Sequence, residues 1–207
     1  MKIVNYTANA GFGIIFPAKT FIKEFDNDIY IISPGDLSDS DINELRNSNK
    51  ALHFIAPNSF HNLYLKKMHK QFPGASFYGP KRAQEQSRIK LDRSENIPTH
   101  DLSVFPINGI PALKESFFYF KKSKELVITD LVFNMHHKMN LATKLAMKLA
   151  GTYHKLGTSR LVKSSIKDKQ EVLNSLAMIK ELEVEKVYLN HGDNISFQEL
   201  KIHLESL

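Results

Sequence analysis

The 207-residue chain contains no cysteine. Its absence excludes disulfide bonds, thiol nucleophiles and thiolate metal ligands. A metal ion in this protein would be held by histidine, aspartate, glutamate or water, a ligand set that favours zinc, manganese or iron. The missing cysteines do not by themselves indicate a cellular compartment.

Long apolar runs are missing too. A membrane-spanning helix needs about 18 or more consecutive apolar residues, and no such run occurs. The short apolar stretch GFGIIFPA is interrupted by two glycines and a proline, so it matches a secretory signal poorly. We therefore expect a cytoplasmic protein with no membrane partner.

Signatures of other enzyme classes are also lacking, because neither a serine-nucleophile arrangement nor a phosphate-cradling glycine loop is found. The chain shows no internal repeat and no low-complexity segment. Its length and its 42% content of hydrophobic residues fit a single globular domain over residues 1–207.

Acidic residues are absent from residues 131–167, although the net charge of the whole chain is only +6. Such a segment is either the solvated face of a basic helix or a surface that faces phosphate, nucleic acid or an anionic substrate. Aromatic residues interleave poorly with the lysines, which disfavours nucleic acid as a partner. The basic residues are Lys138, Lys144, Lys148, Lys155, Arg160, Lys163 and Lys167.

Hydrophobic periodicity predicts a mixed order of strands and helices, typical of an α/β layered fold. Residues 80–98 are polar, and we expect a long loop with about one helical turn there. The expected strands are residues 21–25, 29–33, 51–57, 75–79, 100–107, 116–120, 125–130 and 185–192. The expected helices are residues 38–47, 59–72, 140–151, 168–183 and 196–207.

Capping residues mark the ends of several predicted helices. Ser38 or Ser40 could cap the first helix, while Asp168 and Ser196 precede two later helices. Gly151 ends the helix of residues 140–151.

Polar side chains follow three predicted strands. The segments are IAPNSFHN with Asn58 and His61, VITDLVFN with Asp130, and VYLNHGDN with His191. Each has a local alternative: His61 could cap its helix, Asp130 could cap the next segment, and His191 could be a turn residue. Taken together, two histidines and one carboxylate at strand ends suit one divalent metal ion.

These segments resemble a known family. IISPGDLSD, IAPNSFHNLYLKKMHKQFPGASFYGP, KELVITDLVFNM, LAGTYHKLGTSRLVKSSIKD and VYLNHGDNIS, in this order, resemble an uncharacterised branch of the metallo-β-lactamase superfamily, a domain of unknown function. The resemblance runs from about Phe21 to the C-terminus. It implies a four-layer αββα sandwich, in which loops at one edge of the two sheets supply the metal ligands.

The family signature is His-x-His-x-Asp-His after a strand, and it is depleted here. If His61 is the last histidine of the signature, Ala56 and Asn58 occupy the first two histidine positions and Phe60 occupies the aspartate position. A shift by one residue instead places Pro57, Ser59 and His61 at the two histidine positions and the aspartate position. Both alignments remove the first metal site and leave His61 at the second.

The remaining ligand positions are partly kept. The next family histidine would fall in residues 108–116, where Glu115 is the only potential ligand. Asp130 matches the aspartate that bridges two metals in the family, and His191 matches the last histidine. The resemblance therefore implies one divalent metal held by His61, Asp130 and His191, with Asp130 also orienting the attacking water.

Three functions follow from these observations. The first is a single-metal hydrolase of a small ester, amide, thioester or phosphoester, with Asn58 and Arg160 binding a small, anionic substrate. The second is a non-catalytic, metal-free binding protein on the same scaffold, and the third is a nucleic-acid-binding protein. Whether the protein is an enzyme, which substrate it takes and how it oligomerises stay open.

Other histidines are expected outside the site. Adjacent residues on a helix point about 100° apart, so His136 and His137 could not easily bind one ion together. His53 is expected to face a sheet surface. Surface or packing positions are expected for His69, His100, His154 and His203.

Overall fold

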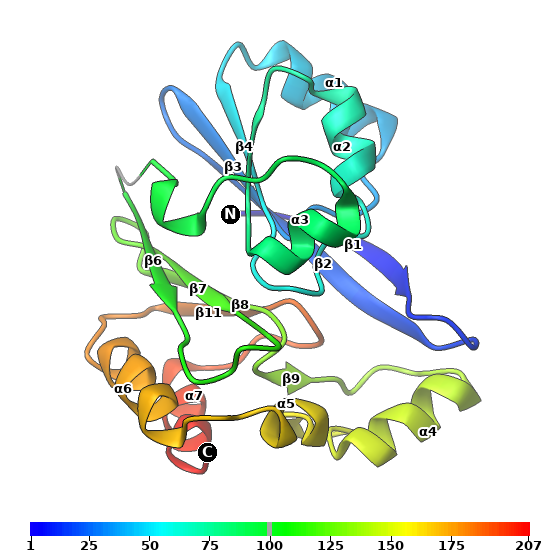
Figure 1. Cartoon of the computed structure of the whole chain (residues 1–207), viewed down its shortest axis with the longest axis vertical. Helices are drawn as coiled ribbons and strands as arrows, with labels where there is room; N and C mark the ends of the chain where they lie inside the picture. Colours follow the sequence, from blue (N-terminus) through cyan, green and yellow to red (C-terminus); the bar gives the residue numbers. More distant parts are fainter. Residues whose placement is uncertain (99–100) are drawn as a thin grey trace. The chain divides into compact units, whose positions relative to one another are not determined.

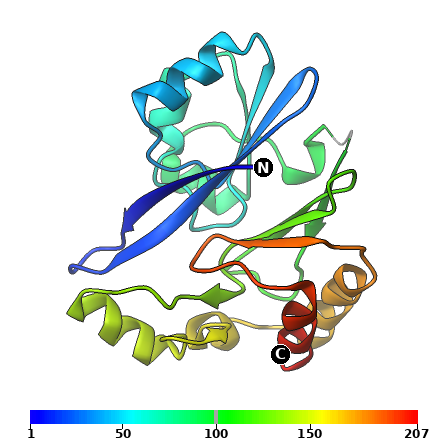
Figure 2. The same cartoon turned by 180° about the vertical axis from the view of Figure 1, so that it is seen from behind.

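The computed structural model describes residues 1–98 and 101–207 (Figures 1 and 2). The chain forms two compact units. The first unit comprises Met1–Ala8 and Ala18–Ile97, and the second comprises Asn9–Pro17 and Pro98–Leu207. Both units combine a sheet with helices, whereas the prediction of one domain over residues 1–207 stays a prediction.

The first unit is built on a five-stranded sheet with the order β1-β2-β3-β4-β5. Pairing of β2 with β3 is antiparallel, and β3, β4 and β5 run parallel. Ile22, Ile31, Phe54 and Phe77 face one another across four strands and form one apolar row. The strands are β1 (Lys2–Asn9), β2 (Ile15–Glu24), β3 (Asp28–Ile32), β4 (Ala51–Ile55) and β5 (Ser76–Tyr78).

Three helices pack on the face of the sheet that carries this apolar row. Their buried side chains, which include Ile42, Leu65, Met68 and Ala83, join the row in one hydrophobic cluster. The helices are α1 (Asp39–Asn47), α2 (Leu65–Gln71) and α3 (Lys81–Ser87), and a short 3₁₀ helix η1 spans Ser94–Asn96. Residues 80–98 are therefore more helical than predicted.

The predicted helix of residues 59–72 begins later than expected, at Leu65. The Oδ1 atom of Asn58 accepts hydrogen bonds from the backbone N–H groups of Phe60, at 2.8 Å, and His61, at 3.3 Å. This side-chain turn competes with helical hydrogen bonding. Leu63, predicted on the apolar face, is instead 61% exposed.

The second unit is built on a four-stranded sheet with the order β11-β8-β7-β6. Three apolar residues face one another across three of its strands: Tyr119, Leu126 and Val187. They pack in one cluster with buried residues of two helices, α6 (Lys169–Lys180) and α7 (Phe197–Glu205). The predicted strand of residues 100–107 is observed from Leu102, and His100 lies outside the described residues. The strands are β6 (Leu102–Pro106), β7 (Ser116–Phe120), β8 (Glu125–Ile128) and β11 (Lys186–Leu189).

The basic part of the second unit contains two short helices and a small ribbon. Strand β9 (Phe133–Asn134) pairs with β10 (Leu156–Gly157), and the helices are α4 (Leu141–Ala150) and α5 (Arg160–Ser164). Gly151 ends α4 with a left-handed backbone, φ 77°, as predicted. The backbone N–H of Ile15 donates to Thr143 on α4 at 2.8 Å, which ties the β1–β2 hairpin tip to this helix.

Sequence and structure agree on the caps that could be assigned. Asp168 and Ser196 cap α6 and α7 through their side chains. None of the helices in the described part of the chain is both long enough and apolar enough to cross a membrane.

The choice between Ser38 and Ser40 as the cap of α1 can be tested. Ser38 and Asp41 form a reciprocal capping box, while Ser40 lies inside the helix. We expect Ser38→Ala to lower the free energy of unfolding by about 1 kcal/mol, because a backbone N–H loses its acceptor. Urea denaturation should show a change below about 0.5 kcal/mol for the control Ser40→Ala. Equal effects of the two substitutions would contradict this assignment.

Candidate metal centre

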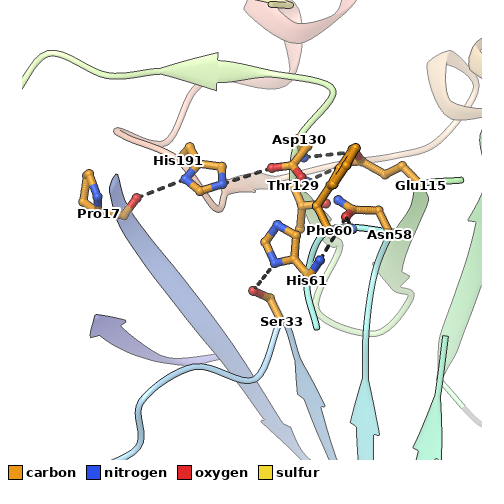
Figure 3. A network of polar contacts seen from close by, with 9 residues as sticks. All are labelled: Pro17, Ser33, Asn58, Phe60, His61, Glu115, Thr129, Asp130 and His191. Atoms are coloured by element: carbon orange, nitrogen blue, oxygen red, sulfur yellow. Dashed lines mark hydrogen bonds and ion pairs between the residues drawn. The ribbon is translucent and has the colours of Figure 1, made fainter. Parts of the chain in front are cut away.

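Asp130 lies just beyond β8, where a buried glutamate fixes its backbone. The two carboxylate oxygens of Glu115 accept hydrogen bonds from the backbone N–H groups of Thr129 and Asp130, both at 2.9 Å (Figure 3). Glu115 is only 1% exposed and Asp130 9% exposed. The carboxylate therefore takes two buried donors that have left the β-ladder, and it sets the direction in which Asp130 leaves the strand.

The charge on Glu115 is suppressed. Burial, and then the neighbouring charge of Asp130, raise the pKa of Glu115 to about 8, although the backbone N–H groups of Thr129 and Asp130 act in the opposite direction. Burial and the neighbouring Asp130 therefore disfavour the ionised form of Glu115.

His191 is oriented from both sides of its ring. Its Nε2 atom lies 3.0 Å from Oδ1 of Asp130, and its Nδ1 atom lies 3.0 Å from the carbonyl oxygen of Pro17 (Figure 3). A carbonyl oxygen only accepts hydrogen bonds, so Nδ1 must carry the hydrogen. Nε2, on the other side of the ring, faces Oδ1 of Asp130. A backbone carbonyl commonly orients a metal-binding histidine in this way.

The ring of His191 is also held by aromatic contacts and by its loop. Phe133 stacks on it with ring centroids 5.2 Å apart, and Phe16 meets it at a steep angle. Gly192 has φ +101°, and a Cβ atom there would lie 2.0 Å from the carbonyl oxygen of Asn134. Only glycine fits this close approach. His191 is thus positioned by its loop and not by helix packing, as expected.

In the first unit, His61 lies within the turn that Asn58 organises. Its Nδ1 atom is 2.7 Å from the hydroxyl oxygen of Ser33, which directly follows β3 (Figure 3). Asn58 follows β4, the parallel neighbour of β3, so both polar residues lie at the carboxyl ends of adjacent strands. His61 precedes α2 by several residues, so it does not cap that helix.

The predicted ligands can now be placed. The side chains suited to metal binding are His61 in the first unit, and Asp130 and His191 in the second. Within the second unit the structure brings Asp130 and His191 into direct contact. The three-ligand site, and the catalytic part given to Asp130, stay predictions.

The two predicted substrate-binding residues have structural contacts of their own. Asn58 is fully buried, and its Oδ1 serves the turn that contains His61. Arg160 is exposed at the start of α5 and donates to the carbonyl oxygen of Leu149 at the end of α4, at 3.3 Å. Their roles toward a substrate stay predictions.

Other histidines make contacts away from these side chains. His53 is buried, lies 2.8 Å from Asp28 and stacks on Tyr30 of the neighbouring strand, as expected for a sheet position. His136 contacts Asn134 at 2.8 Å. Burial lowers the pKa of His203, which contacts Thr158 at 2.9 Å.

Sequence reasoning missed two contributors. The sequence suggests Glu115 only as a potential metal ligand, although an acidic residue directly before the apolar strand SFFYF also indicates a buried carboxylate in need of donors. Pro17 carries no such signal, because its contribution is a backbone carbonyl 174 residues away from His191 in the chain.

Comparisons with known proteins establish the fold. No family model and no curated protein matches the sequence. Solved structures do match over nearly the whole chain. A metallo-β-lactamase from Pontibacter korlensis has a TM-score of 0.60 at 12% identity, covering 99% of this chain and 94% of that one.

Two further matches were solved with metals. The metallo-β-lactamase FIM-1 from Pseudomonas aeruginosa in its mono-zinc form has a TM-score of 0.63 at 9% identity, covering 98% of this chain and 88% of that one. A protein in a di-iron-bound form has a TM-score of 0.60 at 13% identity, covering 99% of this chain and 100% of that one. At these identities the likeness establishes the fold alone, and it confirms the predicted fold class.

The two hydrogen bonds that Glu115 accepts should contribute measurably to the free energy of unfolding. Glu115→Gln places an amide NH₂ group against one of two backbone N–H donors, and a buried donor without an acceptor costs about 1–3 kcal/mol. We expect urea denaturation to show a loss of that size in the free energy of unfolding. The control Glu171→Gln, on the exposed surface of α6, should change it by less than about 0.5 kcal/mol. A Glu115→Gln variant as stable as the control would show that the backbone N–H groups of Thr129 and Asp130 do not depend on two carboxylate oxygens.

Proposed function

Because the chain has the metallo-β-lactamase fold, we propose that it is a hydrolase that uses one divalent metal ion bound by His61, Asp130 and His191. The observation that carries the proposal is the orientation of His191, whose Nδ1–H donates to Pro17 while Nε2 faces Asp130. A histidine fixed through its other nitrogen, beside a carboxylate, is the donor set with which proteins bind zinc or iron.

A single ion is favoured over two. A first metal site would need metal-ligating side chains at the positions of Ala56, Asn58 and Phe60, which do not supply them. The Oδ1 atom of Asn58 already accepts two backbone hydrogen bonds. Similar folds were solved in a mono-zinc form and in a di-iron form, so relatives of this architecture hold either number of ions. His61 enters the proposal through its place in the family signature, and its ring is anchored by Ser33.

The chain's own residues have defined tasks in this proposal. When bound, a divalent ion lowers the pKa of water and polarises a carbonyl or phosphoryl oxygen. Asp130 would bind the ion and orient the attacking water through its carboxylate. Glu115 holds Asp130 in place, and Phe133 and Pro17 hold His191. The substrate class proposed is a small ester, amide, thioester or phosphoester.

The contact between His191 and Asp130 also supports a second candidate, a metal-free binding protein. At 3.0 Å the two side chains form a complete pair that needs no ion to satisfy it, provided that the ring is protonated. The depleted signature favours the same alternative. Metal content separates the two candidates.

The first test is elemental analysis of protein purified without chelator or immobilised metal. We expect close to one equivalent of zinc, manganese or iron in the wild type, and its loss in His61→Ala, Asp130→Ala and His191→Ala, because each substitution removes a ligand. The control His154→Ala changes an exposed histidine and should keep the metal.

A wild type that stays free of metal after reconstitution would overturn the hydrolase proposal in favour of the binding protein. Metal that is retained in the His61→Ala variant, but lost in the other two, would remove His61 from the ligand set.

A preference for anionic substrates rests on the basic residues of α5. Once a substrate is known, we expect Arg160→Ala combined with Lys163→Ala to raise KM for an anionic substrate by about 2–10-fold with little change in kcat, because exposed charges contribute mainly to binding. Steady-state kinetics at several salt concentrations would measure this change. Lys66→Ala combined with Lys70→Ala, on exposed positions of α2, is the control. Identical kinetics for both double variants would exclude a role for Arg160 and Lys163.

A further inference from the structure

Helix α4 carries a leucine stripe on the face turned away from the protein. Leu141, Leu145 and Leu149 are 82%, 58% and 66% exposed. Their spacing of four residues places them on one side of a helix. Thr143 and Met147 lie on the opposite side and are buried. The helix therefore rests on a narrow inner face and presents its larger apolar side chains to the outside.

Two neighbouring segments extend the stripe. Leu161, on α5, is 72% exposed, and Arg160 beside it contacts the end of α4 through Leu149. At the other end, the side chain of Asn140 donates to the carbonyl oxygen of Gly13 at 2.9 Å, so that Phe12, which precedes Gly13 and is fully exposed, belongs to a turn held at the start of α4. We call the set Phe12, Leu141, Leu145, Leu149 and Leu161 the leucine surface. Contiguous exposed apolar side chains of this kind mark interaction sites.

The segments that carry the leucine surface contain basic residues and no acidic ones. Residues 9–17 and 131–167 contain no aspartate or glutamate, and they contain seven lysine and arginine residues. Lys144 and Lys148 lie on α4 itself, over the ring of Tyr153 at 5.7 and 5.5 Å. Any partner of this surface must therefore tolerate leucine side chains and supply negative charge.

These two requirements select the partner. A second copy of the chain, packed symmetrically, would bring Lys144 and Lys148 of both copies together, and like charges repel. Nucleic acid would satisfy the lysines but would leave the leucines without an apolar contact. A lipid surface with anionic headgroups satisfies both, because apolar side chains enter the boundary of the acyl chains while lysines remain among the headgroups.

We propose that the leucine surface binds anionic lipid membranes, with α4 lying in the plane of the interface. A ten-residue helix is about 15 Å long, too short to span a bilayer. The sequence expectation of no membrane partner rested on the lack of a long apolar run. That lack bears on spanning helices and not on a helix that lies on the surface.

The proposal is tested by co-sedimentation of the full chain with vesicles of phosphatidylcholine, alone or mixed with phosphatidylglycerol. We expect binding only to the mixed vesicles, weakening as salt rises. The triple variant Leu141→Ser, Leu145→Ser, Leu149→Ser should lower the apparent partition coefficient at least about tenfold, and Lys144→Gln with Lys148→Gln should lower it by about tenfold or more. The control Met178→Ser with Ile202→Ser changes exposed apolar residues on α6 and α7 and should bind like the wild type.

Other outcomes would overturn the proposal. No binding to the mixed vesicles at low salt would exclude a lipid partner. Binding that depends on the lysines but not on the leucines would show that charge alone acts, as it would toward nucleic acid. Self-association in sedimentation velocity that the leucine variant abolishes, without vesicle binding, would assign the surface to a second copy of the chain.

Discussion

The hydrogen bonds from the backbone of Thr129 and Asp130 to the buried carboxylate of Glu115 fix the end of β8, and the geometry of the candidate metal centre depends on them. A strand end must satisfy its donors once the ladder stops. Here one side chain satisfies two of them at 2.9 Å. Asp130 then leaves the strand in a fixed direction and meets His191. Burial and the neighbouring Asp130 raise the pKa of Glu115, so a second negative charge at this position is disfavoured.

Asn58 organises the turn that follows β4 in the first unit. Asn58, at a position that a histidine would occupy in one alignment to the family, is buried and organises the turn that carries His61. The same side chain delays the start of α2 to Leu65. In the proposed one-metal site, Asn58 would therefore stabilise the loop that bears His61.

The basic segment after Asp130 serves the protein in more than one way. Through Phe133 it packs on the ring of His191, and through α4 and α5 it forms the basic and apolar exterior of the second unit. Arg160 links the two helices by its hydrogen bond to Leu149. A lipid-binding exterior would place the proposed hydrolase beside membranes, where esters and phosphoesters of lipids are abundant.

Much of the fold could be predicted from the sequence, because its signals are local. Short apolar runs marked the strands, and Gly151, Asp168 and Ser196 marked helix ends that the structure contains. The polar residues at the strand ends point to Asp130 and His191, which the structure places in contact. Local signals failed where a side chain competes with the backbone, as Asn58 does in the helix predicted for residues 59–72.

Tertiary structure alone decided how the side chains of the candidate metal centre are oriented and which apolar side chains are exposed on the surface. The tautomer of His191 depends on the carbonyl oxygen of Pro17. A contact made by a backbone atom cannot be predicted from the pattern of side chains in the sequence. Likewise, packing buries Thr143 and Met147 of α4 and leaves its leucines exposed, which the periodicity of the helix alone does not decide. The sequence by itself determined which side chains are available and which segments are strands or helices. Contacts between residues distant in the chain decided which atoms face one another, because they depend on packing that no local pattern encodes.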